Sequence, residues 1–144
     1  MTNASYRVGI IGLSGIAARP RGDAPTPFAN EILISHAASI DHAANVEVAA
    51  YCDLEPKLMD DFSGNWGSRW PGARPYTDYK KMLAHPEIDA VAVVLRVPAH
   101  YQITKDALNA GKHVFTEWPL GATIEEAQEL ADLAKAKGVR ALVG

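Results

Sequence analysis

The stretch Arg7-Val-Gly-Ile-Ile-Gly-Leu-Ser-Gly-Ile-Ala-Ala18 decides the fold class of this chain. Its first half holds three apolar residues that favour β-structure, Val8, Ile10 and Ile11, and they lead directly into a glycine-rich turn. A strand, a glycine turn and a helix, in that order, begin a doubly wound α/β domain that binds a dinucleotide. The stretch therefore predicts a nucleotide-binding turn at the end of the first strand.

The spacing of small residues in this turn departs from the usual dinucleotide fingerprint. The pattern here is G-x-S-G-x-A, whereas the fingerprint is G-x-G-x-x-G/A. Gly12 suits the tight turn, Ala17 suits the close packing of helix on strand, and Ser14 replaces the second glycine. The alternative interpretation is a tight turn without a ligand. If a dinucleotide binds, we expect its pyrophosphate to contact Gly12, Ser14, Gly15, Ile16 and Ala17.

Length and composition limit the class of protein. The chain has 144 residues, which suffice for one domain with a real core, and its apolar content of 48% is ordinary for a globular protein. No apolar run approaches the length of a membrane span, and residues 1–6 lack the features of a signal peptide. A net charge of −3 argues against a general nucleic-acid binder. We expect neither a membrane nor a nucleic acid as partner.

Cysteine and histidine residues give no sign of a disulfide or a metal site. Cys52 is the single cysteine and cannot form an internal disulfide, so with no export signal we expect a cytoplasmic location. No cysteine or histidine spacing resembles a zinc site, and we expect no metal. His36, His42, His85 and His113 are expected to pack on the surface or at helix ends.

Strand and helix patterns alternate along the chain without an internal repeat. Apolar runs predict six strands, over residues 6–11, 46–52, 74–77, 90–95, 113–116 and 139–143. Helical spacing predicts helices over residues 28–44, 55–62, 78–84, 101–109 and from Thr123 to Gly138. This alternation predicts an α/β fold with a doubly wound, mainly parallel sheet of the Rossmann type, and helices on both faces.

Two segments rich in helix breakers are predicted to be loops. Residues 19–27 hold three prolines and a glycine. Residues 63–72 hold several glycines and two of the three tryptophans, Trp66 and Trp70. Because a loop tryptophan usually packs against the core, we expect both indoles to be buried.

Asp53 follows the second predicted strand, where a carboxylate can accept hydrogen bonds from the ribose hydroxyls of adenosine. It comes 41 residues after Gly12, against a usual gap of about 20 residues, so the loop and a longer helix must absorb the difference. The alternative is that Asp53 caps the next helix. A carboxylate here repels a 2′-phosphate and favours NAD over NADP, although Arg19 and Arg21 in the loop are able to reverse that preference.

Ligands of open α/β sheets bind beyond the carboxyl ends of the strands. The most apolar strand ends at residue 95 and leads into the segment Arg96-Val-Pro-Ala-His100, which we expect to form a loop beside the cofactor. Val97, Pro98 and His100 are therefore expected to flank the nicotinamide end.

Several segments, in the same order, carry a resemblance to a known family. They are the glycine turn, the strand ending in Cys52-Asp53, Tyr76-Thr-Asp-Tyr79, His85-Pro-Glu-Ile-Asp-Ala-Val91, Pro98-Ala-His100, Ala110-Gly-Lys-His-Val114 and Glu117-Trp-Pro-Leu120. Together they resemble the N-terminal, dinucleotide-binding domain of the Gfo/Idh/MocA oxidoreductases. The resemblance covers nearly the whole chain, except an inserted region near residues 19–35.

The resemblance implies a cofactor site with one departure. The family has Glu-Lys-Pro after the fifth strand, and that lysine lies near the nicotinamide and helps to move the substrate proton. This chain has Glu117-Trp118-Pro119, and an indole is a hydrogen-bond donor only, so the role of the lysine does not carry over to Trp118. By resemblance, Glu117, Trp118 and Pro119 lie below the nicotinamide, and His100 packs or makes contact beside it.

Three functions remain open. The resemblance implies an NAD(P)-dependent oxidoreductase that acts on a sugar-like or polyol-like substrate. The Glu-Trp-Pro variant is similar to a subgroup that includes the fungal galactose-regulon repressor, which implies a non-catalytic, nucleotide-sensing regulator that binds a protein partner. The third possibility is a doubly wound domain without a cofactor, favoured by the altered fingerprint and the long gap to Asp53.

Family members also carry a C-terminal α/β domain that supplies the substrate pocket and the oligomer interface. We expect residues 1–144 to form the dinucleotide-binding domain alone, with the second domain absent from this chain. The isolated chain is then expected to be inactive, and the full-length parent protein to be a homo-oligomer.

Overall fold

A six-stranded parallel sheet forms the centre of the computed structural model, which describes residues 5–22 and 33–144. Its strands lie side by side in the order β3-β2-β1-β4-β5-β6. Their bounds are β1 Tyr6–Ile11, β2 Val46–Cys52, β3 Arg74–Tyr76, β4 Ala90–Val93, β5 His113–Thr116 and β6 Ala141–Val143. This is the strand order of a doubly wound dinucleotide-binding fold, with its switch point between β1 and β4, so the predicted fold class is confirmed.

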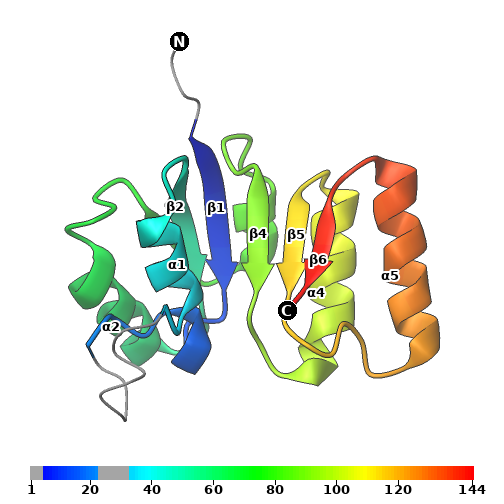
Figure 1. The fold of residues 1–144 in the computed structure, drawn as a ribbon, viewed down its shortest axis with the longest axis horizontal. Coiled ribbons are helices and arrows are strands. Elements are labelled where there is room, and N and C mark those ends of the chain that lie inside the picture. The colour runs from blue at the N-terminus through cyan, green and yellow to red at the C-terminus, as the bar shows by residue number, and fades with distance from the viewer. Residues whose placement is uncertain (1–4, 23–32) are drawn as a thin grey trace.

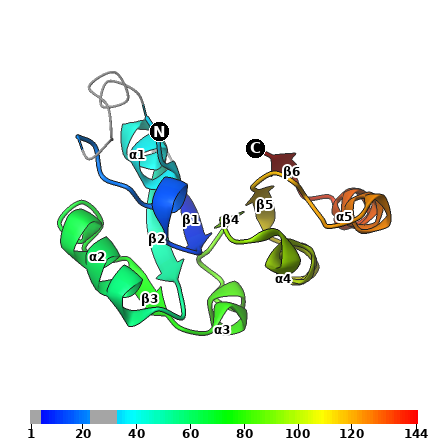
Figure 2. The same cartoon turned by 90° about the horizontal axis from the view of Figure 1, so that it is seen from below.

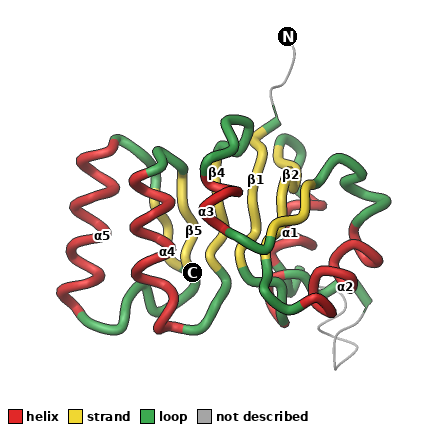
Figure 3. Tube along the Cα trace, turned by 180° about the vertical axis from the view of Figure 1, so that it is seen from behind, coloured by secondary structure: helices red, strands yellow, loops and turns green. Residues whose placement is uncertain are grey.

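Helices cover both faces of the sheet, as the sequence predicts. Viewed from below, α1 and α2 lie on one face, whereas α3, α4 and α5 lie on the other (Figure 2). From behind, α4 and α5 stand side by side, with α4 against β4 and β5 and α5 on its outer side (Figure 3). The bounds are α1 His36–His42, α2 Pro56–Trp66, α3 Tyr79–Leu83, α4 Val97–Asn109 and α5 Ile124–Lys137. None of the helices described is long and apolar enough to cross a membrane.

The two faces are not covered equally. Figure 1 shows α1 in front of β2 and β1, whereas no helix of the described residues stands in front of β4, β5 and β6. The uncovered part of the sheet borders a groove whose lining includes the apolar residues Val8, Ile40, Ala92, Phe115 and Leu142. The sheet is therefore closed on the face of α4 and α5 and partly open on the face of α1.

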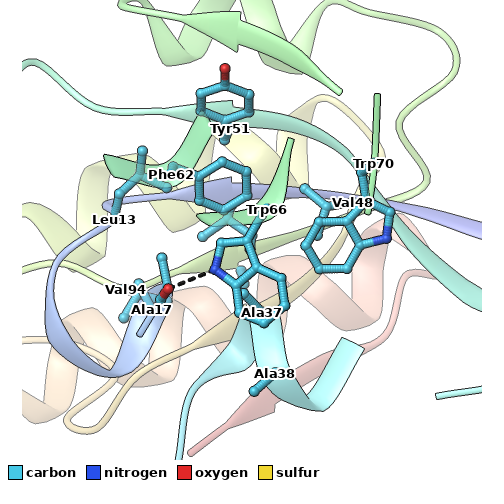
Figure 4. Packing of buried hydrophobic residues seen from close by; sticks show 13 residues of the cluster. Leu13, Ala17, Ala37, Ala38, Val48, Tyr51, Phe62, Trp66, Trp70 and Val94 are labelled. Carbon is cyan, nitrogen blue, oxygen red and sulfur yellow. Dashed lines mark hydrogen bonds between the residues drawn. The ribbon is translucent and has the colours of Figure 1, made fainter. Parts of the chain in front are cut away.

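The core is divided by the sheet into two apolar clusters. On one face, residues of β1 and β2 pack with Phe62, Trp66 and Trp70 beside α2 (Figure 4). On the other face, Met82 and Leu108 are among the residues that fill the space between the sheet and helices α3, α4 and α5. Both tryptophans are buried, as expected, and the Trp66 indole N–H donates to the Ala18 carbonyl at 2.7 Å.

Helix α2 is longer than the sequence predicts. The predicted helix ends at residue 62, but α2 continues through Gly64 to Trp66. A glycine inside a helix costs about 1 kcal/mol. The extra turn places the Trp66 ring against Trp70, with ring centroids 5.2 Å apart, inside the first cluster. Burial of these rings outweighs the local preference of residues 63–66 for a loop.

The region after β1 also differs from the prediction. The glycine turn is followed by a single 3₁₀ turn over Gly15–Ala17, and α1 begins only at His36, whereas the predicted helix begins at residue 28. Residues 28–32 of the predicted helix lie outside the described residues, and residues 33–35 are not helical. Ser35 is the N-cap of α1, since its Oγ accepts from the Ala38 N–H at 3.1 Å and donates to the Arg19 carbonyl at 2.7 Å.

Helix α4 begins at Val97, so the predicted loop over residues 96–100 is wrong. Pro98 lies in the first turn, where a proline is tolerated because its missing N–H has no helical partner to lose. The remaining differences are shifts of one or two residues, at ends of β3, β4, β6 and α3, at the end of α1 and at the start of α2. The predicted signals at both ends of α5 are confirmed: the Thr123 side chain accepts from the Glu126 N–H, and Gly138 has a φ of 66°.

Candidate functional site

The predicted site residues gather at one edge of the sheet. Since the strands are parallel, their carboxyl ends share an edge, which lies at the lower side of the sheet in Figure 1. Residues 12–17 follow β1, Asp53 follows β2, residues 97–100 come after β4, and residues 117–119 follow β5. Four segments that are remote in sequence thus meet around the switch point between β1 and β4.

The glycine turn is held against the end of β4. Gly12 has a φ of +86°, and a Cβ atom at this position would lie 2.1 Å from the Val94 carbonyl oxygen. Its N–H donates to the Cys52 carbonyl at 2.9 Å. The tight turn predicted at Gly12 is therefore present, and no side chain fits there.

In the rest of the turn, three residues are exposed to solvent and one is buried. Ser14, Gly15 and Ile16 are exposed, and a Cβ atom on Gly15 would meet no atom within 4 Å. Ala17 is fully buried, and its N–H donates to the Ser14 carbonyl at 3.0 Å. The first three residues are thus accessible to a ligand, whereas Ala17 packs the turn onto the core.

Asp53 connects the turn to the start of α2. One carboxylate oxygen accepts from the Leu13 N–H at 2.9 Å, and the other accepts from the Glu55 N–H at 3.0 Å. The second bond satisfies a backbone donor at the helix start, although the N-cap residue itself is Glu55. A carboxylate has about four acceptor positions, so ribose hydroxyls remain possible partners of Asp53.

The thiol next to Asp53 is not a nucleophile. Cys52 is buried, and its pKa is raised to about 11, chiefly by burial and further by the nearby Asp53 and Asp78 carboxylates. Because the thiolate is the reactive form, Cys52 is inert at neutral pH.

His100 lies inside the protein rather than in a loop beside the site. It belongs to α4 and is 1% exposed. Its Nδ1 atom lies 2.7 Å from the Pro119 carbonyl oxygen, and its Nε2 atom lies 2.8 Å from that of Leu95. The imidazole therefore joins the segment after β4 to the segment after β5. Val97 and Pro98 lie in the first turn of α4, at the carboxyl edge.

Glu117 is held by a residue for which the sequence analysis predicted only packing. Its N–H donates to the Val93 carbonyl at 3.1 Å, which fixes it at the end of β4. The N–H at Nε2 of His36 donates to Glu117 Oε1 at 2.5 Å, and the His36 ring meets the Phe115 ring edge-on, with centroids 4.8 Å apart. His36 and Glu117 are 81 residues apart, and no local pattern connects them.

Exposed apolar side chains follow three of the strands at this edge. Ile16, Leu54 and Trp118 come after β1, β2 and β5, and all three are largely exposed. Flat apolar groups such as adenine and nicotinamide suit such surfaces, while the glycine turn offers backbone N–H groups to phosphates. In residues 5–22 and 33–144, no group of three or more acidic, cysteine or histidine side chains is arranged to hold a metal ion.

A polar hollow at the opposite edge of the sheet contains none of the predicted residues. Arg7, Arg74, His85 and Glu87 are among its lining residues. These charged groups pair with one another, since Arg7 lies 2.9 Å and Arg74 lies 3.8 Å from Glu87. The hollow therefore has little uncompensated charge for a ligand.

Comparison with known proteins gives a consistent result. A family model described as an oxidoreductase family with an NAD-binding Rossmann fold matches residues 6–144. The inositol 2-dehydrogenase/D-chiro-inositol 3-dehydrogenase of Lactiplantibacillus plantarum is 33% identical over 99 residues, which are 69% of this chain and 27% of that protein.

Solved structures show the same fold. KijD10, a 3-ketoreductase from Actinomadura kijaniata in complex with NADP and TDP-benzene, superposes with a TM-score of 0.76 at 26% identity, over 97% of this chain and 37% of that one. The scyllo-inositol dehydrogenase of Lactobacillus casei, with bound NAD(H) and scyllo-inositol, gives 0.71 at 26% identity, over 97% and 36%. The chain thus spans little more than a third of these two proteins and 19–27% of the first curated relatives.

Proposed function

Because this chain belongs to the Gfo/Idh/MocA family of oxidoreductases with an NAD-binding Rossmann fold, we propose that it binds the cofactor of an enzyme that transfers hydride to or from a sugar-like or polyol-like substrate. The observation that carries this proposal is the meeting of the tight Gly12 turn, Asp53 and the Glu117–Pro119 segment at the switch point of the sheet. Such an edge is where doubly wound folds bind dinucleotides.

The cofactor extends along this edge in our proposal. The pyrophosphate meets the exposed backbone of Ser14, Gly15 and Ile16, and the adenosine ribose meets Asp53. The nicotinamide lies between the first turn of α4, at Val97 and Pro98, and the segment Glu117–Pro119. Support comes from the exposed apolar side chains at the same edge, which are otherwise unfavourable in water.

We propose NAD rather than NADP as the preferred cofactor. The Asp53 carboxylate stands at the end of β2, where a negative charge repels a 2′-phosphate. One structural relative is solved with NADP and another with NAD(H), so membership of the family alone does not determine the preference.

We propose that the substrate pocket and the proton-transfer group lie in parts of the enzyme beyond these residues. Two relatives are named as inositol dehydrogenases, which supports a polyol or sugar as the substrate. The nicotinamide carries the hydride, and the protein supplies orientation. Since the exposed Trp118 indole accepts no proton, we propose that a second, C-terminal domain supplies that group and also forms the oligomer interface.

Trp118 also favours a second candidate function. An indole beside the nicotinamide binds the ring without reacting, as a nucleotide-sensing regulator with a protein partner requires. The two candidates differ in turnover: a full-length protein that binds the cofactor but oxidises no polyol would be a regulator.

The direct test is titration of the chain with NAD(H) and NADP(H), followed by tryptophan fluorescence or calorimetry. We expect the wild-type chain to bind NAD(H) with micromolar affinity. The variants Asp53→Ala and Gly15→Asn are expected to bind NAD(H) more weakly. Asparagine tolerates the left-handed conformation at Gly15 while its side chain blocks the phosphate path. Asp132→Ala, on the exposed surface of α5, is the matched control. Absence of binding at millimolar nucleotide would contradict the proposal.

A further inference from the structure

The hydrogen bond between His36 and Glu117 crosses the switch point of the sheet. His36 is the first residue of α1, which packs beside β2 and the glycine turn, and Glu117 follows β5. The ends of β1 and β4 lie between these two elements. This side-chain hydrogen bond joins the β1–β2 half to the β4–β5 half at the carboxyl edge.

The contact fixes the direction of the Glu117 carboxylate. The backbone of Glu117 is bound to Val93 at the end of β4, and Oε1 is bound to His36. Both side chains are largely enclosed, with exposed fractions of 19% for Glu117 and 21% for His36. Within residues 5–22 and 33–144 no other hydrogen bond reaches this carboxylate, so Oε2 keeps its capacity to face a ligand.

The oxidised and reduced nicotinamide rings differ mainly in charge. The oxidised ring is a cation, and the reduced ring is neutral. Two unit charges about 6 Å apart, at an effective dielectric constant of about 40, interact by an amount that corresponds to roughly a tenfold change in affinity. A fixed and largely enclosed carboxylate beside such a ring would therefore distinguish the two forms.

We propose that the Glu117 carboxylate, oriented by His36, faces the nicotinamide ring and makes this domain bind the oxidised cofactor more tightly than the reduced one. The inference rests on the proposed cofactor site. Glu117 is the group that meets the ring, and His36 is a positioning residue that acts through Glu117.

The test compares affinities for NAD⁺ and NADH, measured by calorimetry on the 144-residue chain at one fixed pH and salt concentration. Wild type is expected to prefer NAD⁺. Glu117→Gln keeps the shape and the bond from His36 but removes the charge, so it is expected to lower NAD⁺ affinity by about three- to tenfold and to change NADH affinity by less than about twofold.

Two variants of His36 separate positioning from a merely structural role. His36→Gln retains an N–H donor toward Glu117, so the ratio of the two affinities is expected to stay close to that of wild type. His36→Leu removes the donor, so Glu117 turns toward water and the ratio falls, by less than in Glu117→Gln. The matched control is Glu125→Gln, which removes an exposed carboxylate in the first turn of α5 and is expected to leave the ratio unchanged.

Equal affinity of wild type for both forms, or equal ratios for Glu117→Gln and Glu125→Gln, would overturn this inference alone. Failure to bind either form would overturn the proposed function as well.

Discussion

The three tryptophans lie in two regions of the molecule, and their side chains differ between these regions in how far they are exposed. Trp66, the last residue of α2, and Trp70, which follows that helix, are 6% and 8% exposed, whereas Trp118, after β5, is 76% exposed. Around the first pair, the glycine turn, Ala17 and Phe62 fill the space with the protein's own atoms (Figure 4). The Trp118 ring, by contrast, is exposed to solvent at the carboxyl edge. We therefore expect substitutions in the β1–β2 region to lower stability, and substitutions after β5 to alter binding.

The largest effect is expected for Gly12→Val. The new side chain would collide with the Val94 carbonyl, and the positive φ of Gly12 adds strain, so we expect a loss of about 4 kcal/mol or more in the free energy of unfolding. Urea denaturation followed by circular dichroism measures it. The matched variant Gly15→Ala has open space around its Cβ and should lose only about 1 kcal/mol. Equal losses would show that the turn is not packed against β4.

Trp66→Ala is expected to rank next. It empties a buried site, removes the ring contact with Trp70 and leaves the Ala18 carbonyl without its donor, at a cost of about 3–5 kcal/mol. Trp66→Phe keeps a ring and loses the hydrogen bond, so it should cost clearly less in the same thermal or urea unfolding experiment. A Trp66→Ala variant as stable as wild type would remove the contrast between the two regions.

Asp53→Asn is expected to cost about 1–2 kcal/mol. The amide offers one acceptor oxygen, whereas the Leu13 and Glu55 N–H groups each bond a different carboxylate oxygen. Denaturation experiments should show this loss, and Asp132→Asn on α5 should stay within about 0.5 kcal/mol of wild type. If Asp53→Asn were neutral for stability but weakened NAD binding, Asp53 would belong with the binding residues.

The smallest effect on stability is expected for Trp118→Ala, within about 0.5 kcal/mol, since the ring is exposed. Its effect should appear in binding: with Trp118 absent, the fluorescence change on adding NADH should fall sharply, because Trp66 and Trp70 are buried and enclosed by the protein's own atoms. A destabilisation as large as that of Trp66→Ala would mean that Trp118 is a packing residue.

Most of the fold could be predicted because its signals are local. The bounds of β1, β2 and β5 agree with the apolar runs, and the ends of α5 agree with the Thr123 and Gly138 signals. Predictions failed where distant contacts outweighed local preference. Gly64 lies inside α2 because Trp66 is buried, and α4 begins four residues early, at Val97, with His100 enclosed.

The sequence by itself determined that the chain is a parallel α/β domain, and that a glycine turn, an acid and a Glu-Trp-Pro segment follow the first, second and fifth strands. Backbone preferences and apolar periodicity depend on near neighbours, so they can be found in the order of residues. Only the tertiary structure decided the partners: Asp53 binds the turn, His100 joins two segments, and His36 holds Glu117. Such bonds depend on where helices pack on the sheet, which no local pattern of residues specifies.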